Sequence, residues 1–130
     1  MIVLDTHIWI WWVSQRDQLS KRLRVQLDEA EEDSLAVSVI SCWEVAKLVE
    51  RGRLELGLSV ESWLQTALAY PSIRLIDLLP EIAVASTQLP GTFHRDPADQ
   101  IIVATAIVLG CPLATVDKRI ATYEHVRTIE

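Results

Sequence analysis

The sequence predicts an α/β domain in which helices cover both faces of a central parallel sheet of about five strands. Short apolar runs rich in β-branched residues alternate with helical patterns along the chain, as expected when helices connect parallel strands. The 130 residues are 50% hydrophobic and 23% charged, which favours a folded core and excludes a disordered chain. No repeat or linker divides the chain, so we expect one domain over residues 1–130.

The first half of the chain alternates strand and helix patterns. The segment 7–13 carries three tryptophans and is apolar on nearly every side, which indicates a short buried helix. The segment 20–31 alternates leucine and valine with charges, which indicates a surface helix. Ser41 is expected to cap a helix that Gly52 ends. The predicted bounds are 2–4 and 34–40 for strands, and 7–13, 20–31 and 41–51 for helices.

The second half continues this alternation. Pro71 and Gly110 end two of its helices, and Asp96 is expected to cap the longest helix, which begins with Pro97. Asp117 is expected to open a short last helix before the final strand. The predicted bounds are 59–70, 80–89 and 97–109 for helices, and 73–78, 112–116 and 126–129 for strands.

Five acidic residues stand where a predicted strand gives way to a helix. Open parallel sheets bind ligands beyond the carboxyl ends of their strands. Carboxylates gathered there repel one another unless they are protonated or bind a cation, and a hard divalent metal such as Mg²⁺ or Mn²⁺ suits oxygen ligands. The sequence therefore predicts an acidic metal pocket and metal-assisted phosphodiester chemistry. The five residues are Asp5, Glu44, Asp96, Asp99 and Asp117.

Each acid also has a purely structural explanation. Asp5 could cap the helix that follows it, and Ser41 with Glu44 fits a capping box in which the carboxylate reaches back to the cap amide. Asp96 and Asp99 could together cap one helix and interact favourably with its dipole. We favour Asp99 as a metal ligand and Asp96 as a cap or outer ligand. The coincidence of all five at one sheet edge favours the metal pocket.

The segments that carry these acids resemble the motifs of PIN-domain ribonucleases, in particular the VapC-type toxins of bacterial toxin–antitoxin systems. The matching segments are LDTH at 4–7, SCWEVAKL at 41–48, HRDPADQIIVATA at 94–106 and LATVDKR at 113–119. The resemblance implies a three-layer α/β/α domain with strand order 3-2-1-4-5. It also implies an endoribonuclease that depends on Mg²⁺ or Mn²⁺ and is neutralised by a small cognate antitoxin.

The resemblance also assigns roles to single residues. It marks four acids as catalytic and metal-binding, adds Asp96 through a DPxD variant of the motif, and identifies two hydroxyl positions, Thr6 and Thr115. The family often has arginine where Gln100 stands, so activity or substrate choice could differ here. The four acids are Asp5, Glu44, Asp99 and Asp117.

The mechanism expected is hydrolysis of RNA by metal-activated water, with Asp5 and Asp99 as the main metal ligands. The substrate could be tRNA, rRNA or mRNA. His7 and His94 flank the acids and are expected to be structural. Basic residues near the motifs are candidates for contact with RNA phosphates. These are Arg95 and Lys118 first, then Lys47, Arg51, Arg53 and Arg119.

The amino-acid composition indicates in which cellular compartment this activity is expected and how well nucleic acid would bind. The net charge of −6 lacks the basic footprint usual for nucleic-acid binding, although bound cations would offset part of it. Two cysteines without metal-ligand spacing suit a reducing cytoplasm, and we expect neither a signal peptide nor a membrane span.

The sequence also leaves two candidate interaction surfaces and two alternative functions to be considered. The five tryptophans should mostly pack in the core, but some, such as Trp12 and Trp63, could line a groove for an antitoxin helix. The helix over 59–70 could serve that groove or a homodimer face. The other functions are a noncatalytic scaffold of the same fold and a receiver-like signalling domain that binds Mg²⁺.

Overall fold

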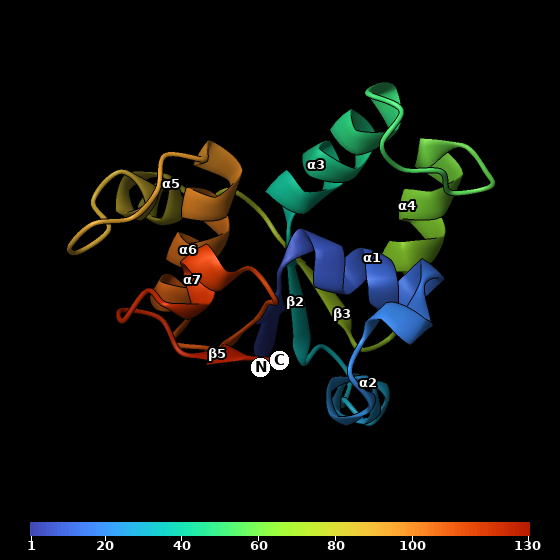
Figure 1. The fold of residues 1–130 in the computed structure, drawn as a ribbon, viewed down its shortest axis with the longest axis horizontal. Coiled ribbons are helices and arrows are strands. Elements are labelled where there is room, and N and C mark those ends of the chain that lie inside the picture. Colours follow the sequence, from blue (N-terminus) through green and yellow to red (C-terminus); the bar gives the residue numbers. More distant parts are fainter.

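Five short parallel strands form one sheet in the order β3-β2-β1-β4-β5, as expected from the motifs. The computed structural model describes residues 1–130. The carboxyl ends of the central strands lie towards the top of Figure 1, and the N-terminus, which leads directly into β1, lies at the opposite edge of the sheet. The strands are β1 (Ile2–Leu4), β2 (Leu35–Ser38), β3 (Ile73–Ile76), β4 (Leu113–Ala114) and β5 (Thr128–Ile129).

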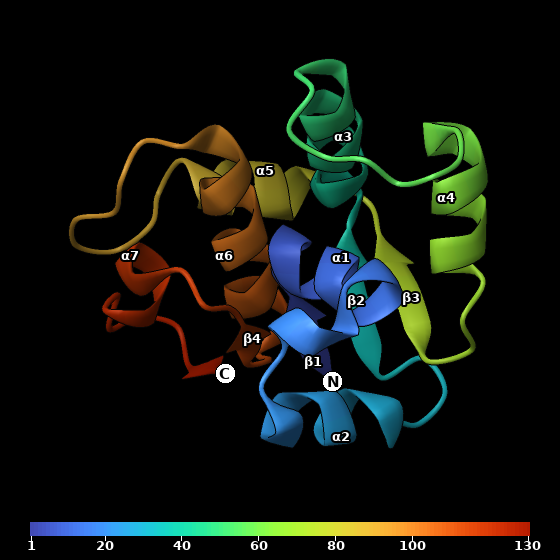
Figure 2. The same ribbon diagram turned by 45° about the vertical axis from the view of Figure 1, so that its right-hand side comes forward.

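Helices cover both faces of this sheet (Figures 1 and 2). One apolar cluster joins one face of the sheet to α1–α4, and a second joins the other face to α5–α7. A short 3₁₀ turn, Arg16–Gln18, precedes α2. The helices are α1 (Thr6–Ser14), α2 (Lys21–Asp28), α3 (Val39–Glu50), α4 (Val60–Leu68), α5 (Pro80–Ser86), α6 (Pro97–Leu109) and α7 (Lys118–Ala121).

The central strands β1, β2 and β4 are apolar up to Ser38, the last residue of β2, because both faces of the sheet are covered. Val3 points into the cluster beneath α5–α7, and the next residue, Leu4, points into the cluster beneath α1–α4. Leu35 and Ala36 divide between the same two clusters. Alternation of side chains across a strand thus yields a continuous apolar run, and the polar residues begin where the strands end.

The start of α3 differs from the prediction. The helix begins at Val39, and its cap is Ser38, whose hydroxyl accepts a hydrogen bond from the amide of Ile40 at 3.2 Å. Glu44 therefore lies in the second turn, and the capping box with Ser41 is wrong. The apolar run through Val39 and Ile40 fits a strand equally well, which is why the pattern placed the boundary too late.

Other boundaries agree more closely. The longest helix has the predicted bounds, with Pro97 in its first turn and Gly110 in the left-handed conformation (φ 66°) at its end. The predicted strand over 112–116 is shorter, since β4 covers only Leu113–Ala114, and the hydroxyl of the next residue, Thr115, donates to Asp5.

Most tryptophans are part of the core. Trp9 is fully buried, whereas Trp12 donates its indole N–H to Asp28 (2.9 Å) and Trp63 to Ser14 (2.7 Å). Trp12 and Trp63 are 6% and 3% exposed, so the expectation that they line an open groove is wrong. Trp43 is the exception at 53% exposed.

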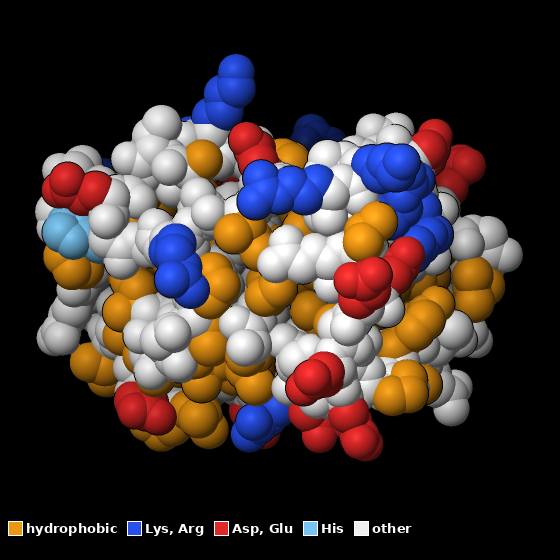
Figure 3. Space-filling view, turned by 90° about the horizontal axis from the view of Figure 1, so that it is seen from below, with side chains coloured by type: hydrophobic (Ala, Val, Ile, Leu, Met, Phe, Trp, Pro, Cys, Tyr) orange, Lys and Arg blue, Asp and Glu red, His pale blue; other side chains and the backbone are white.

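The face of the molecule seen from below in Figure 3 carries mixed side chains. Basic groups there lie among acidic and apolar ones and form no continuous basic stripe (Figure 3). No helix has the length and apolar character needed to cross a membrane.

Candidate active site

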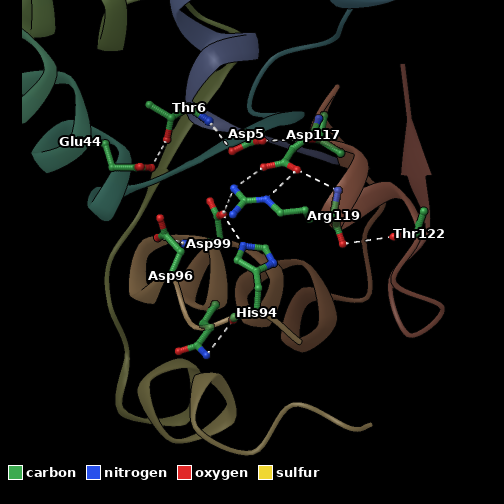
Figure 4. A network of polar contacts seen from close by, with 11 residues as sticks. Asp5, Thr6, Glu44, His94, Asp96, Asp99, Asp117, Arg119 and Thr122 are labelled. Atoms are coloured by element: carbon green, nitrogen blue, oxygen red, sulfur yellow. Dashed lines mark hydrogen bonds and ion pairs between the residues drawn. The ribbon is translucent and has the colours of Figure 1, made fainter. Parts of the chain in front are cut away.

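All five predicted acids line one cavity of about 350 Å³ at the carboxyl ends of β1 and β4. Asp5 follows β1, Glu44 belongs to α3, Asp96 and Asp99 begin α6, and Asp117 follows β4 (Figure 4). Four separate segments thus supply the acids, and the order of the strands brings them together. The cavity is also lined by Thr6, His7, Trp11, Val116 and Arg119.

Asp5 is both a helix cap and a buried site residue. Its Oδ1 accepts a hydrogen bond from the amide of Thr6 at 2.9 Å, and its Oδ2 accepts one from the Thr115 hydroxyl at 2.7 Å. The residue is only 8% exposed. Burial raises its pKa, the Thr115 hydrogen bond opposes this, and the charge of Asp99 adds to the rise. The fold therefore holds Asp5 in one orientation where its negative charge is costly.

Glu44 is held by the same segment. The Thr6 hydroxyl donates to Glu44 Oε1 at 2.5 Å and also hydrogen-bonds the Ser41 hydroxyl at 2.8 Å. Burial raises the pKa of Glu44 to about 7, against the pull of Thr6, and the charges of nearby aspartates contribute to the rise. Glu44 therefore changes its charge near neutral pH.

Asp96 and Asp99 divide two tasks at the start of α6. Asp96 Oδ1 accepts a hydrogen bond from the amide of Asp99 at 3.1 Å, which confirms that it caps the helix. Asp99 is 8% exposed, and its Oδ2 lies 2.6 Å from His94 Nε2. Burial raises the pKa of Asp99 although His94 opposes it.

Asp117 is tied to Arg119 and to Thr115. Its carboxylate accepts from the Arg119 amide at 2.8 Å and from Arg119 Nη2 at 2.9 Å, and these contacts lower its pKa. The Asp117 amide donates to the Thr115 hydroxyl at 3.0 Å. The same Nη2 of Arg119 lies 3.5 Å from Asp99 Oδ2. Arg119 thus links two of the acids across the cavity (Figure 4).

Comparison with known proteins identifies the family. The model of the PIN domain family matches residues 2–126. The chain belongs to the PIN domain family. The resemblance inferred from the motifs is confirmed.

Relatives of this PIN domain agree with that assignment. The chain is 37% identical over 128 residues to a Mycobacterium tuberculosis protein named Ribonuclease VapC22, covering 98% of this chain and 95% of that protein. Two solved structures share the fold: VapBC2 of Rickettsia felis bound to a promoter DNA fragment, and FitAcB of Neisseria gonorrhoeae. The first has a TM-score of 0.70 at 18% identity, covering 99% of this chain and 98% of that one. The second has a TM-score of 0.69 at 24% identity, covering 100% and 97%.

The acids of this PIN domain suit a divalent cation bound through oxygen. Five carboxylates surround the cavity, and the only arginine or lysine that lines it is Arg119. Burial raises the pKa of three of them, so their ionised forms lack enough positive charge nearby. No three acidic, histidine or cysteine side chains are yet close enough together to hold one ion. The donor set therefore fits Mg²⁺ or Mn²⁺ in chemical type, and bound ions would draw the carboxylates together.

Three residues near the acids have contacts that the sequence did not predict. His94 was expected to be structural, yet it contacts Asp99 directly. Gln100 donates to the His94 carbonyl at 3.1 Å and thereby holds the loop that carries this histidine. Arg119 was expected to contact RNA, but in this structure it pairs with Asp99 and Asp117. Only the proximity of these residues to the motifs could have drawn attention to them.

The other basic candidates are less engaged. Lys47 pairs with Glu50 at 2.9 Å, and neither Arg95 nor Lys118 forms an ion pair. His7 lines the cavity and packs edge-on against Trp11, with ring centroids 5.9 Å apart.

Proposed function

We propose that the protein is a divalent-metal-dependent endoribonuclease and the toxin of a toxin–antitoxin pair. The observation that carries this proposal is the convergence of five carboxylates from four segments on one cavity of a PIN domain. Support also comes from a relative named as a ribonuclease and from a structural neighbour described as a toxin–antitoxin complex.

In this proposal Asp5 and Asp99 are the main metal ligands, and Glu44 and Asp117 complete the set. Mg²⁺ or Mn²⁺, when bound, would supply activation of water and neutralisation of charge on the scissile phosphate. Asp96 stays the cap of α6 and could reach the ion only through water. The four ligands are buried or half-buried, which fits a site that must hold several negative charges close together.

Other residues hold these acids in place. Thr115 fixes Asp5, and Thr6 fixes Glu44 through Oε1, leaving Oε2 without a hydrogen bond from the protein. His94 fixes Asp99, and Arg119 offsets part of the negative charge of the cavity. Because these contacts are formed by the folded chain itself, Asp5, Glu44 and Asp99 are each oriented before substrate binds, and a bound ion would only have to draw them closer together.

The partners follow from the same proposal. The substrate is RNA, of the tRNA, rRNA or mRNA class, and a small antitoxin inhibits the enzyme in the cytoplasm. A homodimer is part of the proposal, because apolar side chains of the β3–α5 region are exposed, among them Leu75, Leu79 and Val84.

The test is cleavage of a mixed tRNA and rRNA pool with Mg²⁺, with Mn²⁺ and with EDTA, together with Asp99→Asn. A matched control is Asp77→Asn, which removes an exposed carboxylate that does not line the cavity. We expect metal-dependent cleavage that Asp99→Asn abolishes and Asp77→Asn retains. Folded protein that binds no Mn²⁺ and cleaves nothing would instead identify a noncatalytic scaffold.

A further inference from the structure

A second cavity of about 340 Å³ opens beside the acidic one. The two cavities share Glu44 and Asp96, so they form one continuous depression between α3 and the start of α6. The walls of the second cavity differ in character from those of the first. Ile40, Trp43 and Leu48 of α3 face Pro97 of α6, and the outer side is basic. We call this second cavity the α3 groove.

Trp43 is the most unusual residue of the α3 groove. Its side chain is 53% exposed, although Trp9, Trp12 and Trp63 are buried. Burial of an indole is worth a few kcal/mol, so an exposed one beside a reactive site points to a ligand that covers it. The Nζ of Lys47 lies 5.9 Å from the centre of the Trp43 ring system, which keeps positive charge next to the aromatic face.

Positive charge continues along the same side of α3. Trp43, Lys47 and Arg51 follow one another at intervals of four residues and so lie on one face of the helix. Arg51 forms no ion pair, and Lys47 pairs only with the exposed Glu50. The groove therefore runs from acidic at its inner end to aromatic and then basic at its outer end.

We infer that the α3 groove binds a nucleotide of RNA next to the scissile phosphate, with its base stacked on Trp43. This inference rests on the proposed function and adds a base-binding subsite to it. An aromatic face suits any base, and basic side chains beside it suit the flanking phosphates. The order of chemistry along the groove matches a strand whose scissile phosphate lies at the acids and whose next base and phosphate lie outward.

The basic outer end favours RNA over an apolar partner for this groove. A second copy of this chain or an antitoxin helix would cover Trp43 by apolar contact and would gain little from Lys47 and Arg51. Because the protein as a whole carries a charge of −6, two neighbouring cations beside an exposed indole, of which Arg51 forms no ion pair, are a specific feature of this surface.

The test is a binding experiment in which single bases are removed from the RNA. A fluorescein-labelled RNA of about twelve nucleotides, within the usual range for single-strand sites, is titrated with protein in Mg²⁺. The protein carries Asp99→Asn, in which the proposed function predicts no cleavage. An abasic nucleotide is placed at each position in turn, and Trp43→Ala and Trp43→Phe are added to this background.

We expect Trp43→Ala to raise the Kd about 5- to 150-fold and Trp43→Phe to raise it much less, because stacking survives on a smaller ring. One abasic position should weaken binding by a similar factor with Trp43 present and should have no effect in Trp43→Ala. Arg51→Gln should weaken all RNAs alike and lower the salt dependence by about one charge.

Three results would overturn the inference. Equal abasic penalties with and without Trp43 would show that no base stacks there. A change from dimer to monomer in Trp43→Ala, seen by sedimentation, would assign the groove to a second copy. If the wild-type protein cleaves RNA but Trp43→Ala leaves the Kd unchanged, only the subsite is refuted. If the protein neither binds nor cleaves RNA, the proposed function is refuted as well.

Discussion

Replacing Glu44 by glutamine should stabilise the metal-free protein at neutral and alkaline pH. Burial raises the pKa of Glu44 from 4.5 to about 7, so the folded state disfavours its ionised form. Glutamine has nearly the same shape, and its carbonyl can still accept the Thr6 hydrogen bond that Glu44 Oε1 accepts at 2.5 Å. The substitution therefore removes the costly charge and keeps the contact.

The size of this effect is set by the shift in pKa. Because the pKa of Glu44 is higher in the folded than in the unfolded state, protonation of Glu44 stabilises the fold. This stabilisation is complete below pH 4.5, the unfolded pKa, and is lost as the pH rises through about 7, the folded pKa. At about 1.4 kcal/mol for each pKa unit, the full loss is about 3 kcal/mol by pH 8. Since Glu44 is partly exposed, water screens some of this cost, and we expect Glu44→Gln to add about 1–3 kcal/mol at pH 8.

The assay is urea unfolding in EDTA at pH 8 and at pH 4, where Glu44 is protonated and glutamine should give no advantage. Glu50→Gln is the matched control, because Glu50 belongs to the same helix but is exposed and its pKa is lowered by Lys47. Adding Mg²⁺ should stabilise the wild-type protein and reduce the advantage of the variant. A variant that is less stable than the wild type at pH 8, or whose gain is the same at both pH values, would refute this reasoning.

Three further predictions concern the neighbouring contacts. Arg119→Gln should raise the affinity for Mn²⁺ about two- to fivefold, measured by electron paramagnetic resonance, because it frees Asp99 and Asp117 from their ion pairs. Lys118→Gln is the control and should change the affinity less. Equal effects of the two substitutions would mean that only net charge matters. Thr115→Val should lower the free energy of unfolding by about 1–3 kcal/mol in urea, since its hydroxyl serves both Asp5 and the Asp117 amide, and an unchanged midpoint would contradict this. Asp96→Ala should cost about 1 kcal/mol of stability and Asp96→Asn only a fraction of that; loss of Mn²⁺ binding in the stable Asp96→Asn protein would show that Asp96 is a ligand as well as a cap.

The sequence predicted the sheet and its acidic edge well because both depend on patterns that repeat along the chain. Apolar runs identify buried strands, and the motifs around Asp5 and Asp99 identify the acids at the ends of those strands and at the helix starts beside them. It predicted the start of α3 poorly, because Ser38 and Ser41 are equally good caps by residue type. Which serine caps the helix depends on where β2 leaves its neighbours.

The contacts among the acids could not be predicted, because they depend on the three-dimensional path of two loops. Arg119 reaches Asp99 only because the turn after β4 brings α7 over the start of α6. His94 reaches Asp99 because Gln100 holds the carbonyl of the histidine. Neither relation leaves a periodic trace in the sequence.

The contacts of Thr6 set the direction of a proton chain. A hydroxyl has one proton to donate, and since Thr6 gives its proton to Glu44, the Ser41 hydroxyl must give its own to Thr6. If Glu44 instead carries a proton on Oε1, both hydrogen bonds can reverse, and Glu44 donates to Thr6 while Thr6 donates to Ser41. The charge of Glu44, which is partly exposed, thus determines whether the fully buried Ser41 hydroxyl donates or accepts its hydrogen bond with Thr6.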